Sequence, residues 1–180
     1  MSMNIGVFCS SSNDLLSVYH EEAQKLGAFI GQQQHTLVYG GSKNGLMESL
    51  AKEAHQHGAY IIGILPQDLR AHSSAFVDEV LMVESLAERK EMMKEYADVF
   101  IALPGGFGTL DEIFDVLAEV QIGVHDKKLL IVNIDHFYDA LLEQFKVITE
   151  RNFNGASNKN SYVVVNNATE CIKYLTDNAL

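Results

Sequence analysis

A glycine-rich segment at residues 104–112 holds the groups best suited to chemistry. It reads Pro-Gly-Gly-Phe-Gly-Thr-Leu-Asp-Glu and follows a run, residues 98–103, that is apolar after Asp98 and has the character of a buried parallel strand. Glycine has no Cβ, so this loop can turn sharply and its backbone can approach a ligand closely. The free N–H groups of a helix that begins here, with the positive end of its dipole behind them, favour an anion such as phosphate. The residues expected to form this anion site are Gly105, Gly106, Gly108 and Thr109.

Two carboxylates, Asp111 and Glu112, follow the loop directly. Acidic residues are common in the first turn of a helix because they complement its dipole, by a few tenths of a kcal/mol up to about 1 kcal/mol. Glycines after a strand are also common in α/β proteins. A turn that only binds phosphate has no use for two carboxylates beside the anion, whereas a hydrolase has. With Pro104 closing the strand and Thr109 at the helix start, the combination favours a site over a plain turn.

Two cations precede this loop. Residues 85–97 have helical periodicity, with Leu86, Met93 and Ala97 on one apolar face and Arg89 and Lys90 within or beside it. A long cationic side chain in such a place can simply extend to water. This helix leads into the strand before the glycine-rich loop, however, so its residues can reach the same edge of a sheet. An arginine there would supply the paired, charge-assisted hydrogen bonds that phosphate prefers.

Short β-branched runs alternate with longer helical segments, which is typical of a parallel α/β sheet. The expected strands are residues 5–9, 36–39, 60–65, 80–83, 99–103, 129–134 and 162–165. The expected helices are residues 15–31, 45–57, 85–97, 109–122, 137–152 and 168–176. Several strands are nearly continuous apolar runs, as expected where helices cover both faces. We therefore predict a single α/β domain over residues 1–180, with a Rossmann-like, doubly wound, mostly parallel sheet.

Three glycine- or serine-rich loops follow predicted strands, at residues 10–12, 40–45 and 105–108. Ligands of such sheets bind at the carboxyl ends of the strands, near the switch in strand order, so these loops predict a pocket. Neither a G-x-G-x-x-G after the first strand nor a G-x-x-x-x-G-K-[ST] sequence is present. The pocket is therefore expected to be neither a standard NAD site nor an NTPase site.

The bulk composition excludes several kinds of partner. A formal net charge of −11 argues against nucleic acid and against an anionic membrane surface. No apolar run approaches the roughly 20 residues of a membrane span, and the first residues lack the pattern of a signal peptide. Cys9 and Cys171 are too few for a disulfide framework and fit a reducing compartment. These features predict a cytoplasmic protein.

Neither a metal nor a cofactor is expected. None of the seven histidines pairs with a cysteine or carboxylate at metal-ligand spacing, and no lysine stands out as a Schiff-base candidate for pyridoxal phosphate. His55 and His57 lie two residues apart on a predicted helix, so they should point to different faces and be solvated.

The motifs above resemble the LOG ("Lonely guy") family of cytokinin riboside 5′-monophosphate phosphoribohydrolases, many once labelled lysine decarboxylases. The resemblance rests on Glu88-Arg89-Lys90 with Met93, followed by the loop at residues 104–112. Further matching pieces are Val38-Tyr39-Gly40-Gly41, Gly45-Leu46-Met47 and Gln121-Ile122-Gly123-Val124-His125. It extends from about residue 5 to residue 176. The chain has Ser42 and Glu48 where the family usually has glycines, and Ala87 where it usually has histidine.

The resemblance implies hydrolysis of the N-glycosidic bond of a purine nucleoside 5′-monophosphate, with adenine or an N6-substituted adenine as the base. The products would be free base and ribose 5-phosphate, and no metal is needed. Arg89 and Glu112 match the family's catalytic pair. The residues expected to bind the substrate are Ser11, Ser12, Gly40, Gly41, Lys90, Gly105, Gly106, Gly108, Thr109 and Asp111.

A second hypothesis is a Rossmann-like protein that binds or carries a nucleotide or phosphorylated cofactor without cleaving it. A carrier needs the glycines but not a carboxylate beside them, so the joint presence of Arg89 and Glu112 favours the enzyme. The resemblance also implies a homodimer. Its candidate faces are the helix with Met92, Met93 and Tyr96 and the helix with Ile113, Phe114 and Leu117.

Overall fold

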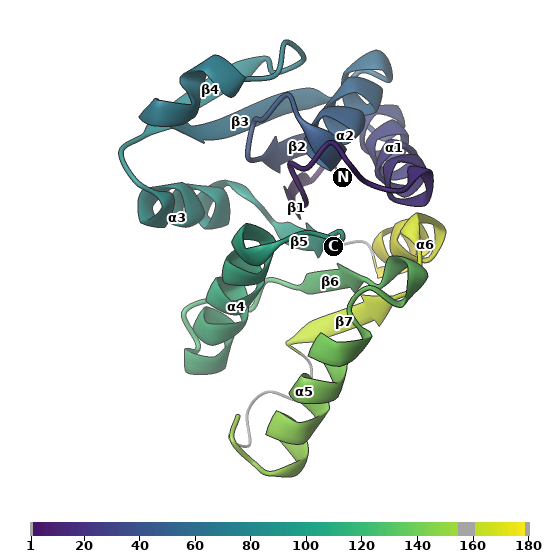
Figure 1. Ribbon diagram of the computed structural model, residues 1–180, viewed down its shortest axis with the longest axis vertical. Coiled ribbons are helices and arrows are strands. Elements are labelled where there is room, and N and C mark those ends of the chain that lie inside the picture. Colours follow the sequence, from purple (N-terminus) through teal and green to yellow (C-terminus); the bar gives the residue numbers. More distant parts are fainter. Residues whose placement is uncertain (1, 155–160, 179–180) are drawn as a thin grey trace.

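The computed structural model describes residues 2–154 and 161–178. Its seven strands form one parallel sheet in the order β4-β3-β2-β1-β5-β6-β7 (Figure 1). The strands are β1 (Asn4–Phe8), β2 (Thr36–Tyr39), β3 (Tyr60–Pro66), β4 (Glu79–Val83), β5 (Val99–Ala102), β6 (Leu129–Val132) and β7 (Tyr162–Val165). The helices are α1 (Ser17–Gln32), α2 (Gly45–Gln56), α3 (Leu86–Tyr96), α4 (Phe107–Ile122), α5 (Asp139–Glu150) and α6 (Ala168–Asn178). The predicted fold class is confirmed.

Helices cover both faces of the sheet because its strands are apolar on both sides. In β5, Val99 and Ile101 pack with α1, α2 and α6, whereas Phe100 and Ala102 pack with α3, α4 and α5. This alternation follows from the two-residue period of a strand. The fold therefore contains two apolar layers, one on each side of the sheet.

The strand order reverses between β1 and β5, and this switch brings two loops together. From β1, the order runs through β2 to β4 in one direction and through β5 to β7 in the other. The Ser10 N–H donates to the Pro104 carbonyl at 3.2 Å, and the Leu46 N–H donates to the Ser10 carbonyl at 3.0 Å. The loops after β1 and β5 and the start of α2 are thus joined at one edge, as expected for a ligand site in this type of sheet.

All predicted strands and helices are present, and the differences lie at their ends. The predicted sixth strand stops at Val132 because the chain turns into a short 3₁₀ helix, Ile134–His136. A second 3₁₀ helix, Gln67–His72, was not predicted. Helix α4 begins at Phe107, two residues earlier than expected, which places Gly108 and Thr109 inside its first turn. Among the described residues, no helix combines the length and apolar character needed to cross a bilayer.

Candidate active site

A pocket of about 350 Å³ lies at the switch between β1 and β5. Its walls come from the loop after β1, the start of α2, the first turns of α3 and the first turns of α4. The lining residues are Cys9, Ser10, Ser11, Ser12, Met47, Leu86, Arg89, Lys90, Gly106, Gly108, Thr109, Asp111 and Glu112.

One wall of the pocket is suited to an anion. Gly106 is the residue before α4, and no side chain caps this helix end. The first N–H groups of a helix have no acceptor within the helix. A Cβ on Gly106 or Gly108 would meet no atom within 4 Å, so this backbone borders open space. On Gly105, in contrast, a Cβ would lie 2.1 Å from Thr109 Oγ1, so only glycine leaves room for the buried Thr109.

The same pocket also holds an ion pair between α3 and α4. Arg89 Nη2 donates to Glu112 Oε1 at 2.9 Å, and the two side chains are only 12% and 8% exposed. Gly40, directly after β2, makes room for this arginine, because a Cβ there would lie 2.4 Å from Arg89 Nη2. The Nε of Arg89 is buried without a hydrogen-bond partner. A buried donor without an acceptor is costly, so this atom is a candidate contact for a ligand.

Burial raises the pKa of Glu112 to about 7, and the charge of Asp111 adds to the effect. The nearby charges of Arg89 and Lys90 oppose it. A carboxylate whose pKa lies near neutrality, beside an arginine in a pocket, has the character of a catalytic acid or base. The pair thus differs from an exposed salt bridge.

Lys90 and Asp111 line the same pocket but bind each other. Lys90 Nζ lies 2.9 Å from Asp111 Oδ1 and 3.2 Å from Asp115 Oδ1. Lys90 also supplies positive charge near Glu112, as its effect on that pKa indicates. Both residues therefore act on the electrostatics of the pocket.

The structure brings most predicted site residues together. Those that line the pocket are Arg89, Glu112, Ser11, Ser12, Lys90, Gly106, Gly108, Thr109 and Asp111. Gly40 lies behind Arg89, and Gly41, with a φ of +69°, packs against Leu65. Gly105 lies on the other side of the loop, where it lines a separate apolar pocket of about 250 Å³.

Three lining residues were not predicted, Cys9, Met47 and Leu86, whereas Ser10 belongs to the predicted loop at residues 10–12. Met47 and Leu86 give the pocket an apolar wall. Leu86 was placed on an apolar helix face, and it is 59% exposed as the first residue of α3. No sequence signal separates these two from core residues. The Cys9 thiol is not a plausible nucleophile, since burial raises its pKa far above its usual value.

Three positions at which the chain departs from the LOG pattern lie outside the pocket lining. They are Ser42, Glu48 and Ala87. Ser42 forms an isolated bridge with Ser73, Ala87 is exposed, and one oxygen of Glu48 is buried without a hydrogen-bond partner. The departures therefore leave the Arg89–Glu112 pair and the anion-binding wall in place.

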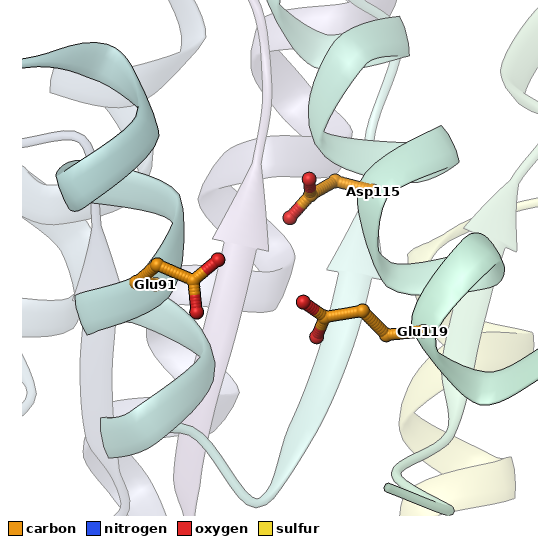
Figure 2. Close-up of side chains that lie close together, drawn as sticks. All are labelled: Glu91, Asp115 and Glu119. Carbon is orange, nitrogen blue, oxygen red and sulfur yellow. The ribbon is translucent and has the colours of Figure 1, made fainter. Parts of the chain in front are cut away.

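One acidic cluster has the arrangement of a cation site. Figure 2 shows Glu91 on α3 facing Asp115 and Glu119 on α4, and a ligand oxygen from each lies within 4.8 Å of the others. The ammonium of Lys94 forms ion pairs with all three. A side chain of the protein thus already contacts all three carboxylates of the cluster. His55 and His57 are exposed, as predicted.

Comparison with known structures supports the fold. A molybdenum cofactor binding protein from Rippkaea orientalis is 24% identical, has a TM-score of 0.73, and aligns over 100% of this chain and 99% of that one. A molybdenum cofactor carrier protein from Chlamydomonas reinhardtii is 21% identical with a TM-score of 0.76, over 98% of each chain. At this identity the likeness concerns the fold alone.

Comparison with characterised sequences identifies the family. A family model described as "Possible lysine decarboxylase" matches residues 47–175. A probable cytokinin riboside 5′-monophosphate phosphoribohydrolase from Oryza sativa subsp. japonica, LOG4, is 36% identical over 97% of this chain and 77% of its own. The Arabidopsis thaliana enzyme LOG3 is 37% identical over 97% of this chain and 82% of its own. The chain belongs to the LOG family of cytokinin riboside 5′-monophosphate phosphoribohydrolases, also described as possible lysine decarboxylases.

Proposed function

We propose that this protein hydrolyses the N-glycosidic bond of adenine or N6-substituted adenine nucleoside 5′-monophosphates. Water adds to C1′ of the ribose as the bond to the base breaks, and the products are the free base and ribose 5-phosphate. The relatives' names agree with this activity. The observation that carries the proposal is the buried Arg89–Glu112 pair, 2.9 Å apart, in the same pocket as an open helix N-terminus.

The two walls of the pocket suit the two ends of such a substrate. The first turn of α4 offers N–H groups and the dipole's positive end to the 5′-phosphate, and Ser11 and Ser12 line the same pocket. Glu112 lies one turn further along α4, where an ionised carboxylate can stabilise the positive charge of an oxocarbenium-like transition state and orient water. Binding energy from the unreactive phosphate then holds the sugar at the carboxylate.

Arg89 is proposed to act on the leaving base or the phosphate while keeping Glu112 oriented. Its guanidinium has five N–H donors, and the contact with Glu112 uses one nitrogen. The unpartnered Nε can therefore donate to a bound substrate. The apolar side chains of Met47 and Leu86 offer a surface for a planar base.

The test compares AMP, adenosine and an N6-isopentenyl AMP as substrates, with the free base followed by chromatography. We expect release from both monophosphates and at least about 100-fold less from adenosine, because the nucleoside lacks the group that the helix N-terminus binds. If AMP raises the melting temperature but no substrate releases base, the protein is a binding or carrier module instead.

We further propose that the protein is a cytoplasmic homodimer. Several large apolar side chains are exposed on or just after α4, including Phe107 at 92%, Ile122 at 77% and Val124 at 63%. Exposed apolar surface of this kind is typical of protein–protein interfaces. Among the side chains predicted for the interface, Met93 and Ile113 are instead fully buried in the core of the subunit, whereas Phe114 is 45% exposed. Two buried free thiols, Cys9 and Cys171, fit a reducing compartment.

A further inference from the structure

A ladder of ion pairs runs along the contact between α3 and α4. Its α3 members are Lys90 and Lys94, four residues apart, and its α4 members are Asp111, Asp115 and Glu119, also at intervals of four. Lys90 bridges Asp111 and Asp115, at 2.9 and 3.2 Å, and Lys94 bridges Asp115, at 2.7 Å, and Glu119. Residues four apart share one face of a helix, so the ladder presents one side of each helix to the other.

Lys94 is the best-enclosed member of this ladder. Its side chain is 7% exposed, and its ammonium also lies 3.0 Å from Glu91. Burial disfavours the charged form, but hydrogen bonds to the three carboxylates outweigh that effect and raise the pKa of Lys94. Lys127, just before β6, donates to the Lys94 carbonyl. A buried charge with several partners fixes geometry more than an exposed pair does, because displacement leaves charges uncompensated.

The ladder lies beside the catalytic pair. The Arg89–Glu112 contact joins the same two helices, since Arg89 precedes Lys90 on α3 and Glu112 follows Asp111 on α4. A helix rises about 1.5 Å per residue, so a slip of α3 along α4 by one residue would separate Arg89 from Glu112. The Arg89 side chain reaches Glu112 past Gly40 and has little room for adjustment.

We propose that Lys94 and Asp115 are positioning residues that hold α3 and α4 in the register in which Arg89 meets Glu112. They act through the helices and touch no reacting atom. The kinetic test of this inference rests on the proposed function. The titration test depends only on the geometry of the protein without substrate.

The test uses a double variant with unchanged net charge, Lys94→Met with Glu119→Gln. It removes the ion pairs of Lys94 with Glu91, Asp115 and Glu119 and the contact of Glu119 with His125. Its matched control is Lys146→Met with Glu143→Gln, which removes an exposed ion pair, 3.6 Å apart, on α5. Lys94→Arg keeps the charge and should restore most of the native behaviour. Circular dichroism and melting temperature establish that each variant is folded.

The first readout is the titration of the Glu112 carboxyl, followed by NMR of ¹³C-labelled protein without substrate. Arg89 and Lys90 lower this pKa, whereas burial and Asp111 raise it; Cys9 and Tyr138 are the other titratable groups nearby. If the ladder holds Arg89 against Glu112, the midpoint in the double variant moves upward from about 7. An unchanged midpoint in a folded variant would overturn the proposal.

The second readout is kinetic. A misplacement of about 1 Å can cost roughly 100-fold, so kcat should fall by about 10- to 100-fold while KM for AMP changes less than about threefold. A kcat within twofold of the native value would contradict the proposal. If the double variant does not fold, Asp115→Asn is measured in its place, with the same kinetic expectation. Wild-type protein that releases no base refutes the proposed function alone, because the titration still tests the register.

Discussion

Glu112 combines two properties that a purely structural carboxylate seldom has. Its side chain is 8% exposed, and its pKa is raised to about 7 by burial, with Arg89 opposing the shift. An unfolded chain ionises the same residue near 4.5. The folded protein therefore binds a proton at Glu112 more tightly than the unfolded chain does. Ionisation of Glu112 lowers the stability of the fold, but it provides a base whose pKa lies near neutral pH.

Glu112→Gln should abolish base release while leaving the fold as stable as the native protein or more so. Between about pH 4.5 and 7 the native protein should lose stability as the pH rises, by at most about 3 kcal/mol, and the variant should lack this loss. Thermal unfolding from pH 4 to 8 measures the difference. Glu143→Gln, at an exposed site, should follow the native curve. At each pH, the stability of the variant is compared with that of the native protein. A difference that favours the variant less at pH 8 than at pH 5 would contradict this prediction.

The pH dependence of kcat/KM should report the ionisation of Glu112. If the ionised carboxylate is the active form, the rate rises with pH and levels off above a midpoint near 7. The measurement is kcat/KM for AMP between pH 5 and 9 with a constant ionic strength. A rate that falls as pH rises through 7 would mean that Glu112 works as an acid.

Two glycines on different elements belong to different parts of the site. Gly40 lies next to the guanidinium of Arg89, which extends from α3. Gly108 lies in the first turn of α4 beside the open pocket. A Cβ on Gly40 would lie 2.4 Å from the Arg89 guanidinium, whereas a Cβ on Gly108 would meet no atom within 4 Å. The same substitution should therefore have different kinetic effects.

We expect Gly40→Ala to lower kcat by about 100-fold with a small change in KM, because it displaces Arg89. Gly108→Ala should instead raise the KM for AMP, because its methyl group occupies space next to the phosphate-binding backbone. The isolated Gly108→Ala protein should melt at the native temperature or above, since alanine favours a helix by up to about 1 kcal/mol. Steady-state kinetics of the two variants, side by side, test this. Equal effects on both parameters would contradict the assignment of the two walls.

The order of elements, the loops that meet and most pocket residues could be predicted from the sequence. Each depends on a local signal, such as an apolar run, a glycine-rich turn or a helical period. The pairing of Lys94 with Asp115 could not, because it depends on how two helices cross the sheet. Likewise, the sequence of an apolar helix face does not show what covers it. Met93 and Ile113 were therefore on candidate interface faces, although they lie in the core. The Arg89–Glu112 contact came from the family resemblance rather than from spacing.

At the scale of the whole molecule, the exposed apolar side chains of α4 predict association. Size-exclusion chromatography with light scattering should give twice the mass of the 20.0 kDa chain. Phe114→Glu should shift the mass toward the monomer, whereas Leu69→Glu, at a similarly exposed residue on the Gln67–His72 helix, should not. A native protein that stays monomeric at high micromolar concentration would refute the dimer.

We expect Glu112 to direct water to the glycosidic bond of a nucleoside monophosphate. The most direct measurement incubates AMP in ¹⁸O-labelled water with the native protein and with Glu112→Gln, and quantifies adenine and ribose 5-phosphate by mass spectrometry. The prediction is equal amounts of both products, with one ¹⁸O in the ribose 5-phosphate, from the native protein, and at least about 1,000-fold less from the variant. Intact AMP after incubation with the native protein, or equal turnover by the variant, would contradict the claim.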